Sequence, residues 1–219
     1  MNKEAKHKIQ IAEAAAERYI INRYFTFDSL AGKTNMKPGE IMDLFPSRSS
    51  MLDYYYESRL ILHSKQTADI PGYPDFTLQE KLSNLFLGLL DQFRDHRKFV
   101  LITYKYRAIK ISDKTNFEIQ LKRELKSIFE NDQKISGTAS VLLNSVLYQS
   151  LLWQFHGLIY FWMNDKSLHQ ENSLALTDKW TAFIEELFYS KITDSGAALG
   201  KFLFYHSPFQ QIFHKQTDS

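Results

Sequence analysis

The residue types that most often carry enzyme chemistry are sparse in this sequence, and their spacing does not favour catalysis. The chain has no cysteine, which excludes thiol nucleophiles, thiolate zinc sites and iron–sulfur clusters. Its histidines, among them His63, His96 and His169, lack the short spacings of metal ligands. No Gly-rich loop follows a strand pattern, and no serine stands in a nucleophile-elbow motif. We therefore expect no enzyme, no cofactor and no metal site.

One later segment carries the residue types of a small-molecule pocket. Gln149, Trp153 and His156 fall near one face of a helix predicted over 140–163, and Tyr104 lies in a helix predicted over 98–111. Large apolar surfaces with a few polar tips are typical of ligand pockets, so these four are the candidate ligand-binding residues. The same pattern is also typical of a core or a subunit interface. Residues 135–164 contain no Asp, Glu, Lys or Arg, but the polar residues within them favour a buried helix over a membrane span.

The elements that position these residues are all predicted to be helices. Only 8 Gly and 5 Pro occur in 219 residues, and nothing alternates with strand period for long. Near the N-terminus the pattern predicts a helix that ends near 21–22, a short one after Thr26, a third from Pro38 and a long fourth with Ser47 as its cap. Helices follow over 78–94, 98–111, 116–130, 140–163 and 174–190, with one or two short ones in 195–213.

The second and third helices, joined by a tight turn, have the outline of a helix-turn-helix DNA reader. The runs that sharpen this outline are TFDSLA (26–31), NMKPGEI (35–41) and FPSRSSML (45–52), close behind IAEAA (11–15). In this order and spacing the first sixty residues resemble the N-terminal domain of the TetR family of bacterial transcription regulators. The resemblance implies a homodimer that binds a double-stranded DNA operator and responds to a small apolar or amphipathic effector.

Several residues of this region have types suited to DNA contact. Lys37 and Glu40 stand at the start of the third helix, and Gly39 permits close backbone approach. Helix starts that can hold a phosphate are expected at Thr26 and Ser47. The candidate DNA-binding residues are Thr26, Lys33, Lys37, Pro38, Gly39, Glu40, Ser47 and Arg48.

We therefore expect an all-α protein with a DNA-binding domain over 1–69 and a ligand-binding and dimerisation domain over 70–219, separated near 70–74. It is expected in the cytoplasm, without a membrane partner, as a ligand-responsive regulator whose expected mode is repression. An alternative remains open. Residues 1–50 hold eight Lys or Arg against six Asp or Glu, and Ile21, Met42 and Leu44 depart from the residues that the family usually has. A lipid-binding protein of TetR-like fold that has lost DNA binding would also fit this sequence.

Overall fold

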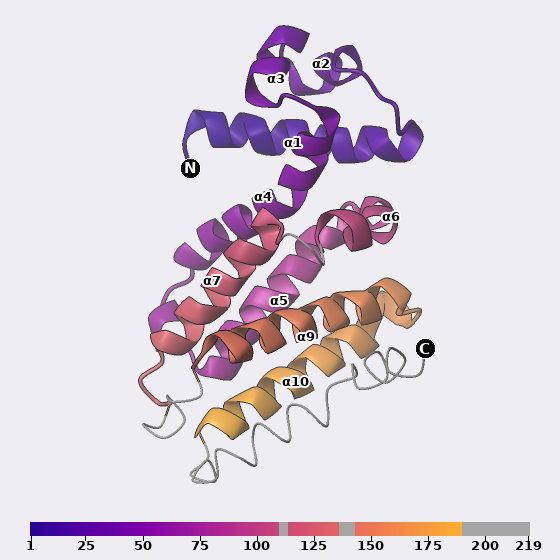
Figure 1. Cartoon of the computed structure of the whole chain (residues 1–219). Coiled ribbons are helices and arrows are strands. Elements are labelled where there is room, and N and C mark those ends of the chain that lie inside the picture. The colour runs from indigo at the N-terminus through magenta and orange to yellow at the C-terminus, as the bar shows by residue number, and fades with distance from the viewer. Residues whose placement is uncertain (110–113, 136–142, 190–219) are drawn as a thin grey trace, which may run out of the picture.

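The computed structural model describes residues 1–109, 114–135 and 143–189, and this part of the chain is all-α, as predicted. Four helices form the upper part of the molecule in Figure 1: α1 (Lys3–Ile21), α2 (Asp28–Thr34), α3 (Pro38–Leu44) and α4 (Arg48–Ala68). Helix α4 packs against α1 and then runs down into the lower part, where it contacts α5 and α7. It therefore belongs to both parts of the molecule and connects them physically.

The lower part begins with a short 3₁₀ turn (Tyr73–Asp75) and continues with α5 (Leu78–Arg94), α6 (Arg97–Arg107) and α7 (Asn116–Glu130). After residues outside the described part come α9 (Ser145–Asn164), a second 3₁₀ turn (Leu168–Gln170) and α10 (Glu171–Tyr189). Helices α9 and α10 lie side by side, and α10 also packs extensively against α5. The short helix α6 lies directly below α1 at the junction of the two parts.

Side-chain caps explain why many of these helices begin where they do. An oxygen of the residue before the first turn accepts a backbone N–H that has no partner within the helix. The caps are Asn2 for α1, Ser47 for α4, Thr77 for α5, Thr115 for α7 and Asn144 for α9. Pro38 starts α3, where its missing N–H costs no hydrogen bond. Local sequence thus sets these boundaries before any tertiary packing.

The interior of the molecule is dominated by aromatic rings. Tyr56 of α4 is buried and lies within 6.0 Å, between ring centroids, of Phe93, Phe99, Tyr104 and Phe117. The contacts with Phe93 and Tyr104 are edge-to-face and the contact with Phe99 is stacked. Aromatic pairs in such arrangements add stability beyond the burial of apolar area. One aromatic cluster therefore holds α4, α5, α6 and α7 together.

The structure corrects three predicted boundaries. Helix α6 ends at Arg107, whereas the sequence pattern placed its end at residue 111, and α9 begins at Ser145, five residues later than expected. Helix α10 begins at Glu171, three residues earlier than expected. The short helices predicted over 195–213 lie outside the described residues. No helix within the described residues is long and apolar enough to cross a membrane.

The turn between α9 and α10 is organised by one carboxylate. Asp165 is 8% exposed and accepts hydrogen bonds from the backbone N–H and hydroxyl of Ser167, at 2.9 and 2.6 Å, and from those of Ser173, at 2.8 and 2.6 Å. These hydrogen bonds favour the charged form, so they hold the pKa of Asp165 well below its ordinary value. The charged carboxylate thereby fixes the start of α10.

An Asp165→Asn protein should consequently melt at a lower temperature than the wild type at pH 7, by roughly 3–6 °C. Because the pKa of Asp165 is lower in the folded than in the unfolded chain, its contribution is fully present above the unfolded value, about 3.9, and falls as pH drops toward the folded value. The gap between the two melting temperatures should therefore shrink below about pH 4. Circular dichroism melts from pH 7 to pH 3 measure this gap. A gap independent of pH would contradict the assignment.

Candidate functional site

Helix α2 is held against α1 by two side chains of α1 that bind backbone carbonyls. Arg18 Nε donates to the Ser29 carbonyl at 3.1 Å, and Gln10 Nε2 donates to the Thr34 carbonyl at 3.3 Å. Leu30 of α2 is fully buried beneath these contacts. The first helix is therefore the platform on which the helix pair α2 and α3 is built.

The turn into α3 is set by local chemistry. Asn35 adopts a left-handed conformation, with φ of 54°, which Asn tolerates better than most residues and which ends α2. The backbone N–H of Lys37 donates to the Glu40 carboxylate at 2.7 Å, and Ile41 anchors α3 with no exposed surface. Lys37, which caps α3, and Gly39 and Met42 within α3 are exposed to solvent. This is the geometry of a helix that can be offered to another macromolecule.

All eight candidate DNA-binding residues lie in or beside α2, α3 and the start of α4. Seven are exposed and Pro38 is half-buried. Several already have structural roles. The hydroxyl of Thr26 accepts the Ser29 N–H at 3.3 Å, and that of Ser47 accepts the Ser50 N–H at 3.1 Å. Each hydroxyl therefore already accepts a backbone N–H at the start of a helix.

The three cations among the eight differ in their partners. Lys33 forms an ion pair with Glu17 of α1, and the Arg48 guanidinium donates to the Phe25 carbonyl at 3.2 Å. For the Lys37 ammonium, no residue in the described part of the chain serves as acceptor. Lys37 is thus the cation of this group most available to an external phosphate or base edge.

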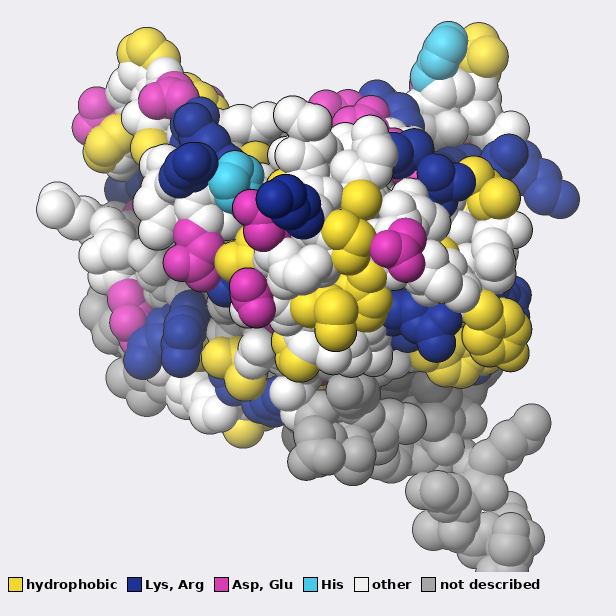
Figure 2. Space-filling view, turned by 90° about the horizontal axis from the view of Figure 1, so that it is seen from above, with side chains coloured by type: hydrophobic (Ala, Val, Ile, Leu, Met, Phe, Trp, Pro, Cys, Tyr) yellow, Lys and Arg dark blue, Asp and Glu magenta, His cyan; other side chains and the backbone are white. Residues whose placement is uncertain are grey.

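Figure 2 looks down on this end of the molecule and shows that basic and acidic side chains are interleaved across it. Apolar side chains also reach the surface here: Met42 is 56% exposed and Tyr24 is 79% exposed. The Arg48 guanidinium lies 6.0 Å from the centroid of the Tyr24 ring. Tyr24 was not among the candidate DNA-binding residues. It could have been found as an aromatic residue in the connection between the first two helices, where no core position was expected.

In the lower part, two of the four candidate ligand-binding residues contact each other. The Tyr104 hydroxyl lies 2.8 Å from His156 Nδ1, and His156 Nε2 lies 3.4 Å from Glu118 Oε1. All three residues are at most 4% exposed. Burial opposes ionisation of Glu118, but the nearby His156 ring and the hydrogen bond from the Thr115 backbone N–H outweigh it and lower the pKa of this carboxyl. A chain of polar groups therefore crosses the interior from α6 through α9 to α7.

The other two residues lie at the edge of this interior. Trp153 and Gln149 are half-buried on α9, and the Trp153 ring centroid is 5.7 Å from that of His156. A groove of about 890 Å³ opens elsewhere, between the C-terminal half of α4, the 3₁₀ turn at Tyr73–Asp75, α5 and α7. None of the four candidate residues lines this groove. Their role in ligand binding stays a prediction.

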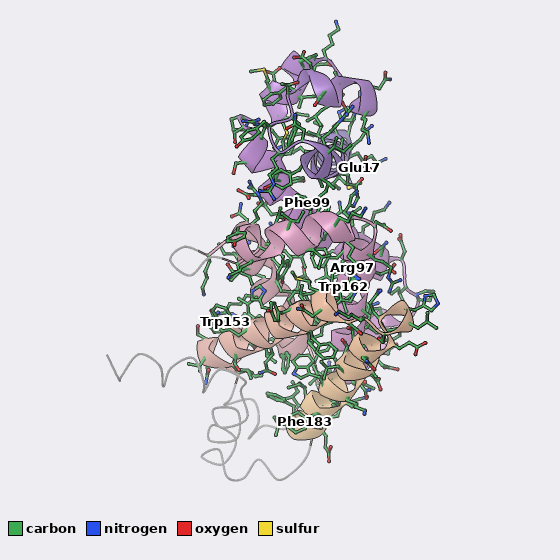
Figure 3. The ribbon with its side chains drawn as sticks, turned by 90° about the vertical axis from the view of Figure 1, so that its right-hand side faces the viewer. Glu17, Arg97, Phe99, Trp153, Trp162 and Phe183 are labelled. Atoms are coloured by element: carbon green, nitrogen blue, oxygen red, sulfur yellow. The ribbon has the colours of Figure 1, made fainter. Side chains whose placement is uncertain are left out.

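The two parts of the molecule meet through polar contacts around α6. Arg107 at the end of α6 donates to Asp53 of α4 at 2.7 Å and to the Ser49 hydroxyl at 3.1 Å. On the α1 side, His96 Nε2 lies 3.7 Å from a Glu17 carboxylate oxygen, and Figure 3 shows Glu17 above Phe99 of α6. These contacts connect α6 with α1 and with the start of α4.

Helices α9 and α10 leave apolar side chains exposed. The exposed large apolar residues of these two helices are Val146, Tyr160, Phe161, Leu174, Leu176 and Phe183. Figure 3 shows Phe183 near the lower end of α10 and Trp153 on α9. Because α9 carries no Asp, Glu, Lys or Arg along its whole length, its exposed face is uncharged. Large apolar side chains exposed on helices of this kind are typical of protein–protein interfaces.

The fold and these surfaces define a class of protein: a helix-turn-helix domain joined through a long shared helix to a larger helical domain. Residues 81–203 match the family model described as the tetracyclin repressor-like C-terminal domain. The chain belongs to the TetR family of transcription regulators, which confirms the resemblance stated above.

One solved structure matches a larger share of the chain than the family model does. The crystal structure of the TetR transcriptional regulator from Nitrosomonas europaea matches 80% of this chain and 96% of its own length, with a TM-score of 0.59. The two sequences are 17% identical, so this likeness shows the shared fold alone. None of the curated proteins compared matches the chain.

Proposed function

We propose that the protein is a homodimeric transcription regulator that binds a two-fold symmetric DNA site and releases it in response to a small amphipathic molecule. The observation that carries this proposal is the exposed face of α3, which is fixed by the Asn35 turn and presents a Lys37 ammonium without an acceptor in the described residues. Residues 1–69 would bind DNA, and residues 70–219 would dimerise and sense the effector. Repression is the expected mode, because release of DNA by the effector then allows transcription.

The proposed dimer is formed by the exposed faces of α9 and α10. Packing these two helices against their copies would make a four-helix interface and would place the two α3 helices on one side of the dimer. A symmetric pair of α3 helices reads two half-sites separated by one or more turns of the duplex. The net charge of residues 1–50 is only +2, so one DNA-binding domain alone would bind weakly. Two such domains joined in a dimer would bind the same duplex more tightly.

The proposed response runs through α4 and α6. An effector that prefers one arrangement of the lower helices shifts the population of that arrangement by its difference in affinity. Arg107 with Asp53 and Ser49, and His96 with Glu17, connect α6 to both helices that carry the DNA-binding pair. The spacing of the two readers in the dimer would change accordingly.

A second candidate is a lipid-binding protein that keeps this fold without binding DNA. The interleaved charges in Figure 2 favour it, because a strong reader usually concentrates basic residues on one face. The two candidates differ in their response to salt. We expect the wild-type protein to bind a fluorescent mixed-sequence duplex of 30 base pairs, with the logarithm of the binding constant falling against that of salt concentration at a slope of roughly −3 to −4. Fluorescence anisotropy measures this slope, and lack of binding at 50 mM salt would favour the second candidate.

A further inference from the structure

The groove between α4, α5 and α7 has a charge arrangement that points to a ligand. It is formed by α4 at His63, Ser64 and Thr67, by the 3₁₀ turn at Tyr73 and Phe76 beside it, and by α5 and α7. Its volume of about 890 Å³ lies within the range of small-molecule sites. The α4 helix that forms one wall is the same helix that begins at Arg48 beside α3. Whatever fills this groove therefore touches the element that connects the two parts of the molecule.

The central feature of the groove is a buried ammonium. Lys81 lines the groove, is 8% exposed and donates from Nζ to the Pro74 carbonyl at 2.9 Å. Within the described part of the chain, no carboxylate oxygen lies close enough to Lys81 Nζ, at 4.0 Å or less, to form an ion pair. Buried cations are normally paired, because removing a charge from water is costly. Two of the three ammonium hydrogens remain for a further acceptor.

The position of Lys81 in its helix makes this charge more costly still. Helix α5 begins at Leu78, so Lys81 is the fourth residue and lies in the first turn, where the helix dipole carries partial positive charge. A cation there is disfavoured by the helix and would be stabilised by an anion. His63 adds no positive charge at neutral pH, since burial lowers its pKa to about 4. The missing partner of Lys81 is therefore a single negative group.

The remaining lining limits what that anionic molecule can be. Phe76, Leu85 and Ile128 provide apolar wall, and the Tyr73 and Phe76 rings lie 5.4 Å apart. Asp75, Glu124 and Asp132 also line the groove. Glu124 accepts a hydrogen bond from the Ser64 hydroxyl at 3.3 Å, and Asp132 accepts one from the Tyr189 hydroxyl at 2.7 Å. These carboxylates would repel a molecule with several negative charges. A molecule with one anionic end and an apolar body fits the lining best.

We propose that this groove binds a small amphipathic monocarboxylate, whose carboxylate pairs with Lys81 and whose apolar chain lies along Phe76, Leu85 and Ile128. The proposal rests on the proposed function only where it treats this molecule as the effector. The binding site itself is inferred from the lining of the groove. It assigns effector binding to residues of α4, α5 and α7 that the sequence did not indicate.

Binding of decanoate to the full chain, followed by isothermal titration calorimetry at pH 7.5 without DNA, tests the proposal. Decan-1-ol and decylamine, which have the same chain with a neutral or a cationic end, are the comparison ligands. We expect decanoate to bind at least about 10-fold more tightly than either, because only its head group forms a charge-assisted hydrogen bond with Lys81. Tighter binding of decylamine would show that Glu124 and Asp132 dominate. That result, equal affinities for the three ligands, or no binding of decanoate would overturn the proposal.

Variants assign the site. Lys81→Met should lower the affinity for decanoate at least about 10-fold and leave the affinity for decan-1-ol nearly unchanged. The control is Lys134→Met, which changes an exposed lysine that also lines the groove. It should alter the affinity for decanoate less than about 3-fold. If Lys81→Met does not fold, Phe76→Ala keeps the ammonium and should weaken both ligands by removing apolar wall. Unchanged decanoate affinity in Lys81→Met or Phe76→Ala would overturn the site. Because no DNA is present, either outcome is independent of whether the chain binds an operator.

Discussion

A Lys37→Glu protein is expected to bind its DNA site about 100-fold more weakly than the wild type, because a dimer presents two copies of α3 and each copy exchanges a favourable contact for a repulsive charge. Lys37 is exposed, and only its backbone N–H takes part in the cap of α3. The substitution should therefore leave the melting temperature within about 2 °C of the wild type. Fluorescence anisotropy measures the affinity on a duplex that carries the site recovered by selection from random duplexes, and circular dichroism measures the melting temperature.

The matched control is Lys65→Glu, which makes the same charge change at an exposed position in the last turn of α4, far along the chain from α3. It should weaken DNA binding less than about 3-fold, through the net charge alone. Equal losses in the two variants would mean that Lys37 has no particular place in the interface. A weaker effect of Lys37→Ala together with a shallower salt slope would identify its partner as a phosphate.

Replacing Phe183 by Asp should convert the dimer to monomers of 25.7 kDa at micromolar concentration. Phe183 is 38% exposed on α10, and burying an unpaired carboxylate in each half of a symmetric apolar interface should raise the dissociation constant at least about 100-fold. Light scattering over a dilution series measures the mass. DNA binding should be lost with the dimer, since each monomer would read one half-site only.

The control for this substitution is Tyr106→Asp, an equivalent exchange of an aromatic side chain for a carboxylate at a position of α6 that is 71% exposed. It should leave the dimer intact. A monomeric wild-type protein, or a Phe183→Asp protein with unchanged dimer mass, would remove α9 and α10 as the interface. Leu147 of the uncharged helix α9 is not a suitable site for the same substitution. It is only 6% exposed, so an Asp there would disrupt the core.

Local sequence predicted the fold well because many boundaries depend on caps. The range 78–94 of α5 and the range 116–130 of α7 were predicted to the residue, and each begins beside a threonine that accepts an N–H of the first turn. The start of α10 was placed three residues late because its cap lies in the preceding turn. Asp165 reaches it from eight residues before Ser173, which no helical period reveals.

The candidate site was less accessible from sequence because it depends on contacts between distant segments. The sequence pattern indicated both Lys33 and Lys37 as DNA-binding candidates. In the structure Lys33 forms an ion pair with Glu17 of α1, and Lys37 does not. Similarly, Tyr104 and His156 were selected as pocket walls, whereas the structure places their polar atoms 2.8 Å apart. The groove around Lys81 could not be predicted from the sequence because its lining runs from His63 to Lys134, which are 71 positions apart.

The central claim, that the N-terminal helix pair reads DNA as part of a dimer, is tested most directly by selection from random duplexes. Wild-type protein and the Lys37→Glu variant are incubated separately with a random 30-base-pair library, and bound duplexes are sequenced after several rounds. The account predicts that the wild type enriches one sequence with two inverted half-sites, separated by one or more turns of the duplex, and that the variant fails to enrich it. Enrichment of no sequence by the wild type, or of the same site by both proteins, would contradict it.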